Sequence, residues 1–253
     1  MDRRVGRGGF ADVYAATDTL LGLKVALKIP LPTMVSDELL DEFRREAKLT
    51  IQLEHPNILP IRDASFIDGY FVIVTPLGEQ TLDERLKKRM ASETCFEIGS
   101  QLLDAVATAH QSGVIHCDIK PDNILMFGPR HIRLGDFGIA KAALKTISGS
   151  GTGTIGHMAP EQAMGKPSMR SDVFSIGLIA YRMFSGSWPE YPFRWPMEGV
   201  AALRRKCHPE LVRVIRRSIE TEPAERFRDA VKMQEAWEAT RLKSLRFFKR
   251  NRR

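Results

Sequence analysis

Three residues with complementary chemistry fall close together in the sequence HCDIKPDN, at positions 116–123. Asp118 can accept a proton from a hydroxyl, and Lys120 can place a positive charge beside a transferred phosphoryl group. Asn123 adds an amide oxygen, a group that divalent cations accept as a ligand. Further along, Asp136 stands beside a phenylalanine and a glycine and is suited to binding Mg²⁺. These residue types fit the transfer of a phosphoryl group to a hydroxyl.

A glycine-rich segment, GRGGFADV at 6–13, lies near the start of the chain. Glycines in a turn between strands let backbone N–H groups approach a phosphate closely, although ordinary hairpins contain such turns too. Lys28, at the end of the next extended segment, is placed to reach the same phosphate. Glu46, in the first predicted helix, can pair with Lys28 if that helix packs on the sheet. Taken singly, Lys28 and Glu46 are more typical of a solvated surface.

The elements that must position these residues change in character along the chain. The first third is rich in short extended runs, interrupted by one amphipathic helix that starts near Ser36. The remainder is mostly helical. Extended runs are predicted at 5–18, 24–30, 58–66 and 70–75, and helices at 94–111, 172–185, 209–221 and 228–245. The pattern therefore predicts a small β-rich lobe followed by a larger helical lobe.

The net charge of the chain comes from one end. The 253 residues contain 38 basic and 31 acidic side chains, a formal charge of +7, yet residues 241–253 hold seven basic residues and no acidic one. The rest of the chain is formally neutral, so we expect no nucleic-acid partner. No apolar run is long enough to span a bilayer, and the three cysteines form no metal or disulfide pattern. A reduced, cytoplasmic setting is the expectation.

The ordered set of motifs resembles the eukaryotic-type protein kinases. Arg226 also stands where that family has a partner for the glutamate of its Ala-Pro-Glu motif, and Asp172 with Gly177 is similar to its buried helix. HPN at 55–57 and MAPEQ at 158–162 look most like bacterial serine/threonine kinases. The matching segments are GxGxxxxV at 6–13, VALK at 25–28, Glu46, HxDxKxxN at 116–123, DFG at 136–138 and APE at 159–161.

The resemblance implies an α+β, two-lobed protein-kinase fold. A small N-terminal antiparallel sheet with one helix would cover residues 1–75, and a larger, mostly helical C-terminal lobe would cover residues 79–240. Residues 76–78 would form the hinge, and residues 241–253 a basic tail. ATP with Mg²⁺ would bind between the lobes.

The resemblance also assigns roles to matching positions. Asp118 would orient and deprotonate the acceptor hydroxyl, Lys120 would neutralise the γ-phosphoryl group, and Asn123 and Asp136 would hold Mg²⁺. Lys28, paired with Glu46, would bind the α- and β-phosphates. The remaining nucleotide-binding positions would be Gly6, Gly8, Val13, Ala26, Ile73, Val74, Pro76 and Leu125.

The implied activity is phosphorylation of serine and threonine hydroxyls in proteins, including autophosphorylation. Lys120 and Thr154 are the residue types of serine/threonine kinases, and Thr154 would help to dock the peptide. Candidate phosphorylation sites in the activation loop are Thr146, Ser148, Ser150 and Thr152. The alternatives are a pseudokinase that acts as a nucleotide-binding scaffold, and a kinase whose acceptor is a small molecule.

Three positions depart from the family pattern. Ala11 replaces the third glycine of the glycine-rich segment, so its methyl group could crowd the phosphates, and Thr50 replaces a larger apolar residue. Cys117 replaces the arginine that receives a phosphate on the activation loop. We therefore hypothesise that catalysis does not require a phosphorylated activation loop.

The basic tail has two interpretations. Leu242, Leu245 and Phe248 form a narrow apolar stripe among basic residues, which fits contact with an anionic membrane surface. Similar kinases continue through such a basic segment into a transmembrane helix, so membrane association of a longer chain is one expectation. The other interpretation is the solvated, frayed end of a helix.

Overall fold

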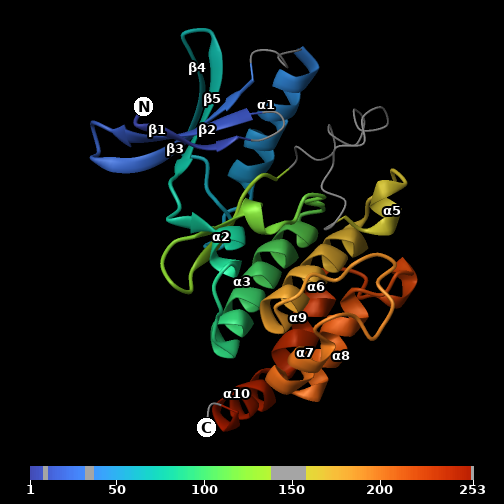
Figure 1. The fold of residues 1–253 in the computed structure, drawn as a ribbon. Coiled ribbons are helices and arrows are strands. Elements are labelled where there is room, and N and C mark those ends of the chain that lie inside the picture. Colours follow the sequence, from blue (N-terminus) through green and yellow to red (C-terminus); the bar gives the residue numbers. More distant parts are fainter. Residues whose placement is uncertain (8–10, 32–36, 138–157, 252–253) are drawn as a thin grey trace.

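The computed structural model describes residues 1–7, 11–31, 37–137 and 158–251. Within helix α1 (Asp37–Gln52) it describes the side chains at 41, 44 and 47–52. A twisted sheet with α1 beside it forms a small lobe, and a bundle of helices forms a larger lobe (Figure 1). The predicted α+β architecture with two unequal lobes is confirmed.

The small lobe contains a five-stranded antiparallel sheet in the order β1-β2-β3-β5-β4. The register places Lys28 opposite both Val13 on one side and Ile73 on the other. Three positions expected to contact the nucleotide are therefore cross-strand neighbours. The strands are β1 (Arg3–Arg7), β2 (Ala11–Asp18), β3 (Leu23–Pro30), β4 (Asp63–Ile67) and β5 (Tyr70–Pro76).

The turn between β4 and β5 follows from its two residues. Asp68 and Gly69 have φ angles of 50° and 82°, in the left-handed region that aspartate tolerates and glycine adopts without steric cost. Two such residues in succession match the twist of the flanking strands, so the hairpin closes in register with Ile67 opposite Tyr70.

The extended run predicted at 58–66 forms a strand only in its second half. Before β4, Ile58 pairs instead with Leu134 of β8 (Ile132–Leu134) in the large lobe, and its side chain is 1% exposed. The peptide groups on either side continue this contact, since Leu59 N donates to Leu134 O and Leu134 N donates to Asn57 O, each at 2.8 Å. Ile58 and Leu59 of this run are thus buried against the large lobe, whereas Phe66 is 51% exposed.

The motif at 116–123 leads directly into a short second sheet. This sheet contains β6 (Gln80–Thr81), β7 (Ile124–Met126) and β8, with the 3₁₀ turn η2 (Pro121–Asn123) directly before β7. Gly78, just before β6, is needed for close approach, because a Cβ there would lie 3.0 Å from Leu125 Cβ. This packing brings residues 77–79, the link between the lobes, against β7.

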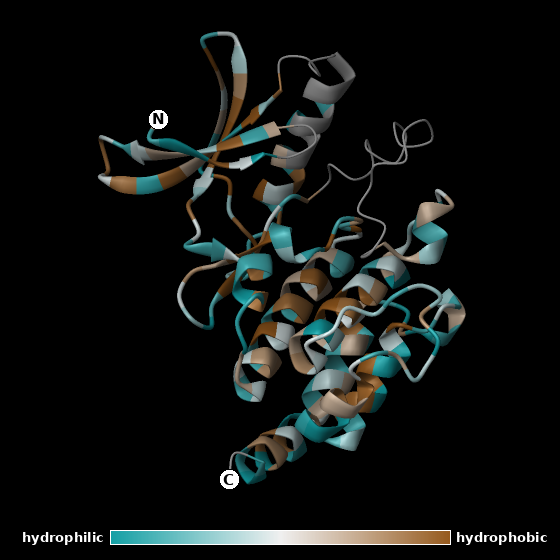
Figure 2. Ribbon diagram, viewed as in Figure 1, coloured by the Kyte–Doolittle hydropathy of each residue, from teal (hydrophilic) through white to brown (hydrophobic). Residues whose placement is uncertain are grey.

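The large lobe is built around two long, nearly fully buried helices, α3 and α6. Gly177 of α6 allows α8 to pack closely, because a Cβ at this position would lie 2.2 Å from Ser218 Oγ. Hydrophobic residues face the interior of the bundle and hydrophilic residues the outside (Figure 2). The helices before the C-terminal pair are α2 (Leu82–Leu86), α3 (Ser92–Gln111), α5 (Pro160–Ala163), α6 (Met169–Ser185), α7 (Val200–Lys206) and α8 (Pro209–Ser218).

The C-terminal part differs from the prediction. The single helix expected at 228–245 is two helices, α9 (Ala230–Ala239) and α10 (Arg241–Arg250), which meet at Thr240. The boundary predicted at 240 falls at the break between these helices, and residues 241–250 form α10. Phe248 of α10 is 2% exposed and its ring centroid lies 6.2 Å from those of Phe96 and Phe184.

The apolar stripe of the tail is thus largely a packing surface. Leu245 and Phe247 also pack against the core of the large lobe, while Leu242 is 70% exposed. Lys243 Nζ pairs with Glu210 Oε1 of α8 at 2.5 Å, and Asn251 donates to Arg205 O of α7 at 2.9 Å. The described part of the tail is a docked helix and not a frayed end.

Candidate active site

A cavity of about 480 Å³ lies between the sheet of the small lobe and the short sheet of the large lobe. It is lined by residues from β1, β2, β3 and β5 on one side and from η2, β7 and the segment after β8 on the other. Of the positions expected to bind the nucleotide, those that line it are Gly6, Val13, Ala26, Lys28, Ile73, Asn123, Leu125 and Asp136.

Two expected nucleotide-binding residues, Val74 and Pro76, do not line the cavity. Side chains alternate between the faces of a strand, so if Ile73 points into the cavity the next to do so is Thr75, followed by Leu77. The Val74 carbonyl is also occupied, because it accepts a hydrogen bond from Arg62 N at 2.8 Å. Leu77 forms no backbone hydrogen bond with another described residue.

Asp118, Lys120 and Asn123 meet at one carboxylate oxygen. Lys120 Nζ lies 2.8 Å and Asn123 Nδ2 lies 3.0 Å from Asp118 Oδ2. Asn123 Nδ2 also donates to the Asp118 main-chain carbonyl at 2.9 Å, which holds the loop closed around the side chain. Asp118 Oδ1 accepts no hydrogen bond from the described residues, so it is the oxygen available to an incoming hydroxyl.

Lys28 crosses the cavity to the large lobe. Its Nζ atom lies 2.7 Å from Asp136 Oδ1, and the two side chains are 13% and 38% exposed. Burial raises the pKa of the Asp136 carboxyl, but the charge and hydrogen bond of Lys28 outweigh it and leave the pKa below its usual value. The Glu46 side chain lies outside the described residues, so its pairing with Lys28 stays a prediction.

The oxygen atoms left over in the cavity suit a magnesium ion. Because Asn123 uses its amide nitrogen to hold Asp118, its oxygen is left free to bind a cation. Asp136 uses Oδ1 for Lys28 and stays ionised, which leaves Oδ2. Two protein oxygens completed by phosphate oxygens and water are what Mg²⁺ usually accepts. The described residues contain no cluster of three or more acidic, histidine or cysteine ligands.

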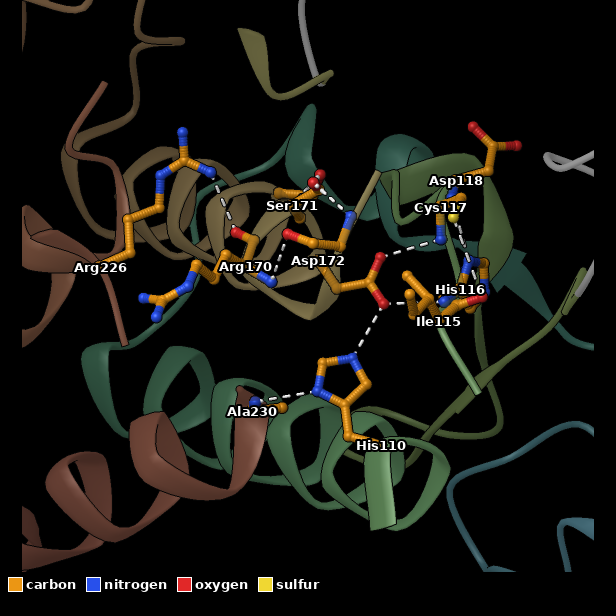
Figure 3. A network of polar contacts seen from close by, with 12 residues as sticks. His110, Ile115, His116, Cys117, Asp118, Arg170, Ser171, Asp172, Arg226 and Ala230 are labelled. Carbon is orange, nitrogen blue, oxygen red and sulfur yellow. Dashed lines mark hydrogen bonds and ion pairs between the residues drawn. The ribbon is translucent and has the colours of Figure 1, made fainter. Parts of the chain in front are cut away.

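The loop at 116–123 is held in place by one buried carboxylate, that of Asp172. Asp172 of α6 is 1% exposed and accepts hydrogen bonds from His116 N at 2.8 Å, Cys117 N at 2.9 Å and His110 Nε2 at 2.9 Å. Figure 3 shows the carboxylate between His110 and the backbone of the loop. Three donors satisfy a buried charge that would otherwise be costly, so this contact fixes the loop that carries Asp118.

The hydrogen bonds also define the tautomers of the two buried histidines. His110 Nδ1 accepts from Ala230 N at 3.0 Å, so Nε2 carries the proton that it donates to Asp172. His116 Nδ1 accepts from Asp118 N at 3.2 Å, and its Nε2 donates to Gly135 O at 2.9 Å. His116 therefore joins the backbone of Asp118 to the residue before Asp136.

A second contact holds the catalytic loop from the side of the activation segment. Gln162, which is 3% exposed, donates from Nε2 to the carbonyl oxygen of Cys117. Cys117 has a φ of 65°, a conformation that few residues other than glycine adopt without support. Sequence reasoning did not select Gln162, because a glutamine after the Ala-Pro-Glu motif gives no sign of a partner 45 residues away.

The partner of Glu161 is Arg226, as the resemblance implied. Arg226 Nη1 and Nη2 lie 2.8 and 3.0 Å from the two oxygens of Glu161, and the Arg226 side chain has no exposed surface. Burial raises the pKa of Glu161, but hydrogen bonds from Arg226 and Ser171 outweigh it and lower the pKa overall. This bidentate pair joins the end of the activation segment to the turn before α9.

The departures from the family pattern have structural explanations in two cases. Ala11 is 5% exposed, and its methyl group packs with Phe71 and Ile73 in the core of the small sheet. Cys117 is buried as well, with its Sγ 3.9 Å from Ile115 O. Thr50 is buried and lines the back of the cavity beside Lys28 and Ile73.

Several predicted positions lie outside the described residues. These are Gly8 of the glycine-rich segment, the four candidate phosphorylation sites Thr146, Ser148, Ser150 and Thr152, and the peptide-docking residue Thr154. Their roles stay predictions.

The two-lobed fold and the residues at its cleft define a protein kinase domain. The family model described as "Protein kinase domain" matches residues 1–233, which is most of the chain. The chain therefore belongs to the protein kinase domain family.

Several proteins to which the chain is similar come from bacteria. The chain is 34% identical over 196 residues to the probable serine/threonine-protein kinase PknB of Lactococcus lactis, with 74% of this chain and 31% of that protein covered. It is 35% identical over 195 residues to the serine/threonine-protein kinase PrkC of Bacillus subtilis, covering 74% and 30%. For PknA of Mycobacterium tuberculosis the identity is 35% over 202 residues, covering 75% and 47%. The matched segment thus spans less than half of each of these relatives.

Proposed function

We propose that this chain is a serine/threonine protein kinase that transfers the γ-phosphate of ATP to hydroxyls of proteins. The observation that supports this most is the joint position of Asp118, Lys120 and Asn123 on one side of the cavity, with Lys28 and Asp136 paired across it. The names of the relatives support serine and threonine as acceptors.

The proposed reaction uses the free oxygen of Asp118. Asp118 Oδ1 accepts the hydroxyl proton as the serine or threonine oxygen bonds to the γ-phosphorus, and the bond from that phosphorus to the β-phosphate oxygen breaks to release ADP. Lys120 lies beside the same carboxylate, where it can neutralise charge on the moving phosphoryl group. The work of the protein is positioning and electrostatics.

Residues of both lobes would contact the nucleotide in the cavity. Val13 and Ala26 would pack on one face of the adenine and Leu125 on the other, while the unpaired N–H and C=O of Leu77 would bind its edge. Lys28 would turn from Asp136 toward the α- and β-phosphates. Asn123 and Asp136 would hold Mg²⁺, whose chemistry is to neutralise charge on the phosphates.

The direct test compares wild type with Asp118→Asn in a transfer assay that uses ATP labelled at the γ-phosphate. We expect labelling of the chain itself and of an added protein by wild type, and a loss of at least about a hundredfold in the variant. Mass spectrometry should find the label on serine or threonine. Equal labelling by both proteins would exclude the proposed reaction.

The pseudokinase alternative predicts a different pair of results. A scaffold would bind nucleotide, with Lys28→Met weakening that binding, yet wild type would transfer no phosphate. Lys28, Glu46, Asp118, Asn123 and Asp136 are all present, and the side chains of all but Glu46 are described. Nucleotide binding without transfer by wild type would favour the scaffold.

We further propose that activity does not depend on a phosphorylated activation loop. Cys117 offers no cation to a phosphate, and the backbone around it is already held by Asp172 and Gln162. Replacing Thr146, Ser148, Ser150 and Thr152 together by alanine should change kcat on an added substrate by less than about threefold. A loss of nearly all activity would contradict this proposal.

Contact with an anionic membrane surface is a second proposal, favoured by one observation. The last turn of α7 contains Arg204, Arg205 and Lys206, and the Asn251 hydrogen bond places it beside the basic end of α10. No helix in the described part of the chain is long and apolar enough to cross a membrane. Sedimentation with vesicles of anionic lipid should be reduced when Lys249 and Arg250 are replaced by glutamine, and equal binding to neutral vesicles would reject the proposal.

A further inference from the structure

A second cavity lies in the large lobe, apart from the nucleotide cleft. Its volume is about 410 Å³, and it is bounded by the start of α6, the end of α8, the turn η4 (Pro223–Glu225) and the start of α9. Its lining consists of Arg170, Arg217, Ala224, Arg226, Phe227, Arg228 and Lys232, so no lining residue is acidic. Figure 3 shows Arg170 and Arg226 at the opposite end of the polar network from Asp118.

Two arginines of this cavity, Arg170 and Arg217, are oriented by backbone carbonyls and not by a carboxylate. Arg170 Nη1 donates to Pro223 O at 3.0 Å, and Arg217 Nε donates to Glu225 O at 3.2 Å. Both guanidinium groups are thus tied to the carbonyls of one short turn. Among the described residues neither has an ion-pair partner, and each retains N–H groups that those carbonyls do not use.

The charges around the cavity leave a surplus. Arg226 pairs with Glu161, Arg228 with Asp229 at 2.9 Å, and Lys232 with Glu235 at 2.7 Å. Five cations therefore meet three carboxylates, and two positive charges, those of Arg170 and Arg217, are uncompensated. Glu222 and Glu225 belong to the same turn but do not line the cavity.

We propose that this cavity binds the phosphoryl group of a phosphorylated serine or threonine in a polypeptide. A phosphate monoester carries a charge close to −2, which matches the surplus, and arginine forks match its oxygen atoms. Ala224 and Phe227 give the cavity an apolar part for the adjoining side-chain carbon atoms, and Arg217 is held over the Phe227 ring at 4.4 Å. The choice of phosphoserine or phosphothreonine rests on the proposed function, because that reaction would produce such groups.

Binding should be measured without catalysis, in the Asp118→Asn variant and without nucleotide. The probes are a fluorescent peptide with one phosphothreonine, its unphosphorylated twin, and inorganic phosphate as a competitor. We expect the phosphopeptide to bind at least about tenfold more tightly than its twin, and each of Arg170→Gln and Arg217→Gln to weaken it about tenfold. Inorganic phosphate should compete only at concentrations well above the Kd of the phosphopeptide.

Two control variants locate the site. Arg213→Gln removes the same charge from the same helix as Arg217, but Arg213 is 76% exposed and does not line the cavity, so binding should change less than about twofold. Lys28→Met removes a cation from the nucleotide cleft and should also leave binding unchanged. Arg217 is exposed, so Arg217→Gln can be tested even if Arg170→Gln affects folding.

Four results would overturn the proposal. They are equal binding of the phosphopeptide and its twin, an effect of Arg213→Gln equal to that of Arg217→Gln, loss of binding in Lys28→Met, and competition by inorganic phosphate at the Kd of the peptide. Because no transfer is needed, a chain that phosphorylates proteins normally and fails this test would reject the inference alone. A chain that binds the phosphopeptide but transfers no phosphate would reject only the proposed function.

Discussion

Two ion pairs join elements that are distant in the sequence, and they differ in how deeply they are buried. Glu161 and Arg226 form a bidentate pair, and Arg226 also donates to the carbonyls of Glu220, Thr221 and Arg170. Lys28 and Asp136 share one close contact at 2.7 Å, and Asp136 remains 38% exposed.

The difference indicates separate duties. An arginine with all of its donors used inside the protein has nothing left to offer a ligand, so the Glu161–Arg226 pair holds structure. The Lys28–Asp136 pair instead lines a cavity, and its carboxylate remains partly exposed. Breaking the first pair should destabilise the protein, whereas breaking the second should stop its chemistry.

The largest expected effect is on stability, in Arg226→Met. Removing one partner leaves Glu161 charged in a largely buried place, which costs about 3–5 kcal/mol of the free energy of unfolding. Urea denaturation measures the change. As a matched control, Arg216→Met removes an exposed arginine paired with Glu220 and should change stability far less. Similar losses in the two variants would mean that the buried pair has no special structural duty.

Lys28→Met should instead reduce activity by about a hundredfold to a thousandfold in kcat/KM, because a charged donor to the phosphates is lost. The urea midpoint should stay close to that of wild type, since both partners retain contact with water. Lys24→Met is the control on the same strand, where the lysine is 63% exposed and pairs with Asp2. If Lys28→Met were unfolded at ordinary temperature, the Lys28–Asp136 pair would also be needed for stability, and the proposed difference between the two pairs would be wrong.

A smaller effect is expected for Gln162, which lies next to the structural pair but touches the catalytic loop. Loss of its hydrogen bond to Cys117 O in Gln162→Leu should lower kcat about three- to tenfold and leave the KM for ATP unchanged. Gln111→Leu, at an exposed site at the end of α3, should have no effect on kcat. A change confined to stability, with kcat intact, would make Gln162 purely structural.

The smallest effect concerns pH. The pKa of Glu161 lies below its ordinary value of 4.5, so its pair contributes stability above that pH and loses the contribution as pH falls through the lowered pKa. Between about pH 6 and about pH 3.5, wild type should therefore lose more free energy of unfolding than Arg226→Met does. Urea titrations of both proteins at the two pH values would reveal it, and an equal loss in both would mean that Arg226 does not lower this pKa.

The sequence predicted the residues of the site better than their contacts. Asp118, Lys120 and Asn123 are close along the chain, so their meeting follows from one tight loop. Val74 and Pro76 do not line the cavity, which follows from alternation along a strand that presents Ile73 to it, and their role in nucleotide binding stays a prediction. Gln162 was not predictable, since nothing in one sequence identifies the main-chain carbonyl that its amide reaches.

Residues 241–253 show a second limit of prediction from the sequence. The spacing of Leu242, Leu245 and Phe248 defines a helix face, but periodicity does not say what covers that face. In the folded protein Phe96 and Phe184 cover it in part, and both lie more than fifty positions before the tail. Helix boundaries near Thr240 were equally hidden, because no glycine or proline marks the break.

The pairing of Ile58 with Leu134 constrains motion between the lobes. The segment 57–59, which follows α1, is hydrogen-bonded into the large lobe, so the C-terminal end of α1 travels with that lobe and not with the sheet. The chain otherwise passes between the lobes at residues 77–79. Two points of attachment define an axis, and opening of the cleft is therefore a rotation about the line that joins them. Such a rotation would separate Lys28, on the sheet of the small lobe, from Asp136 of the large lobe.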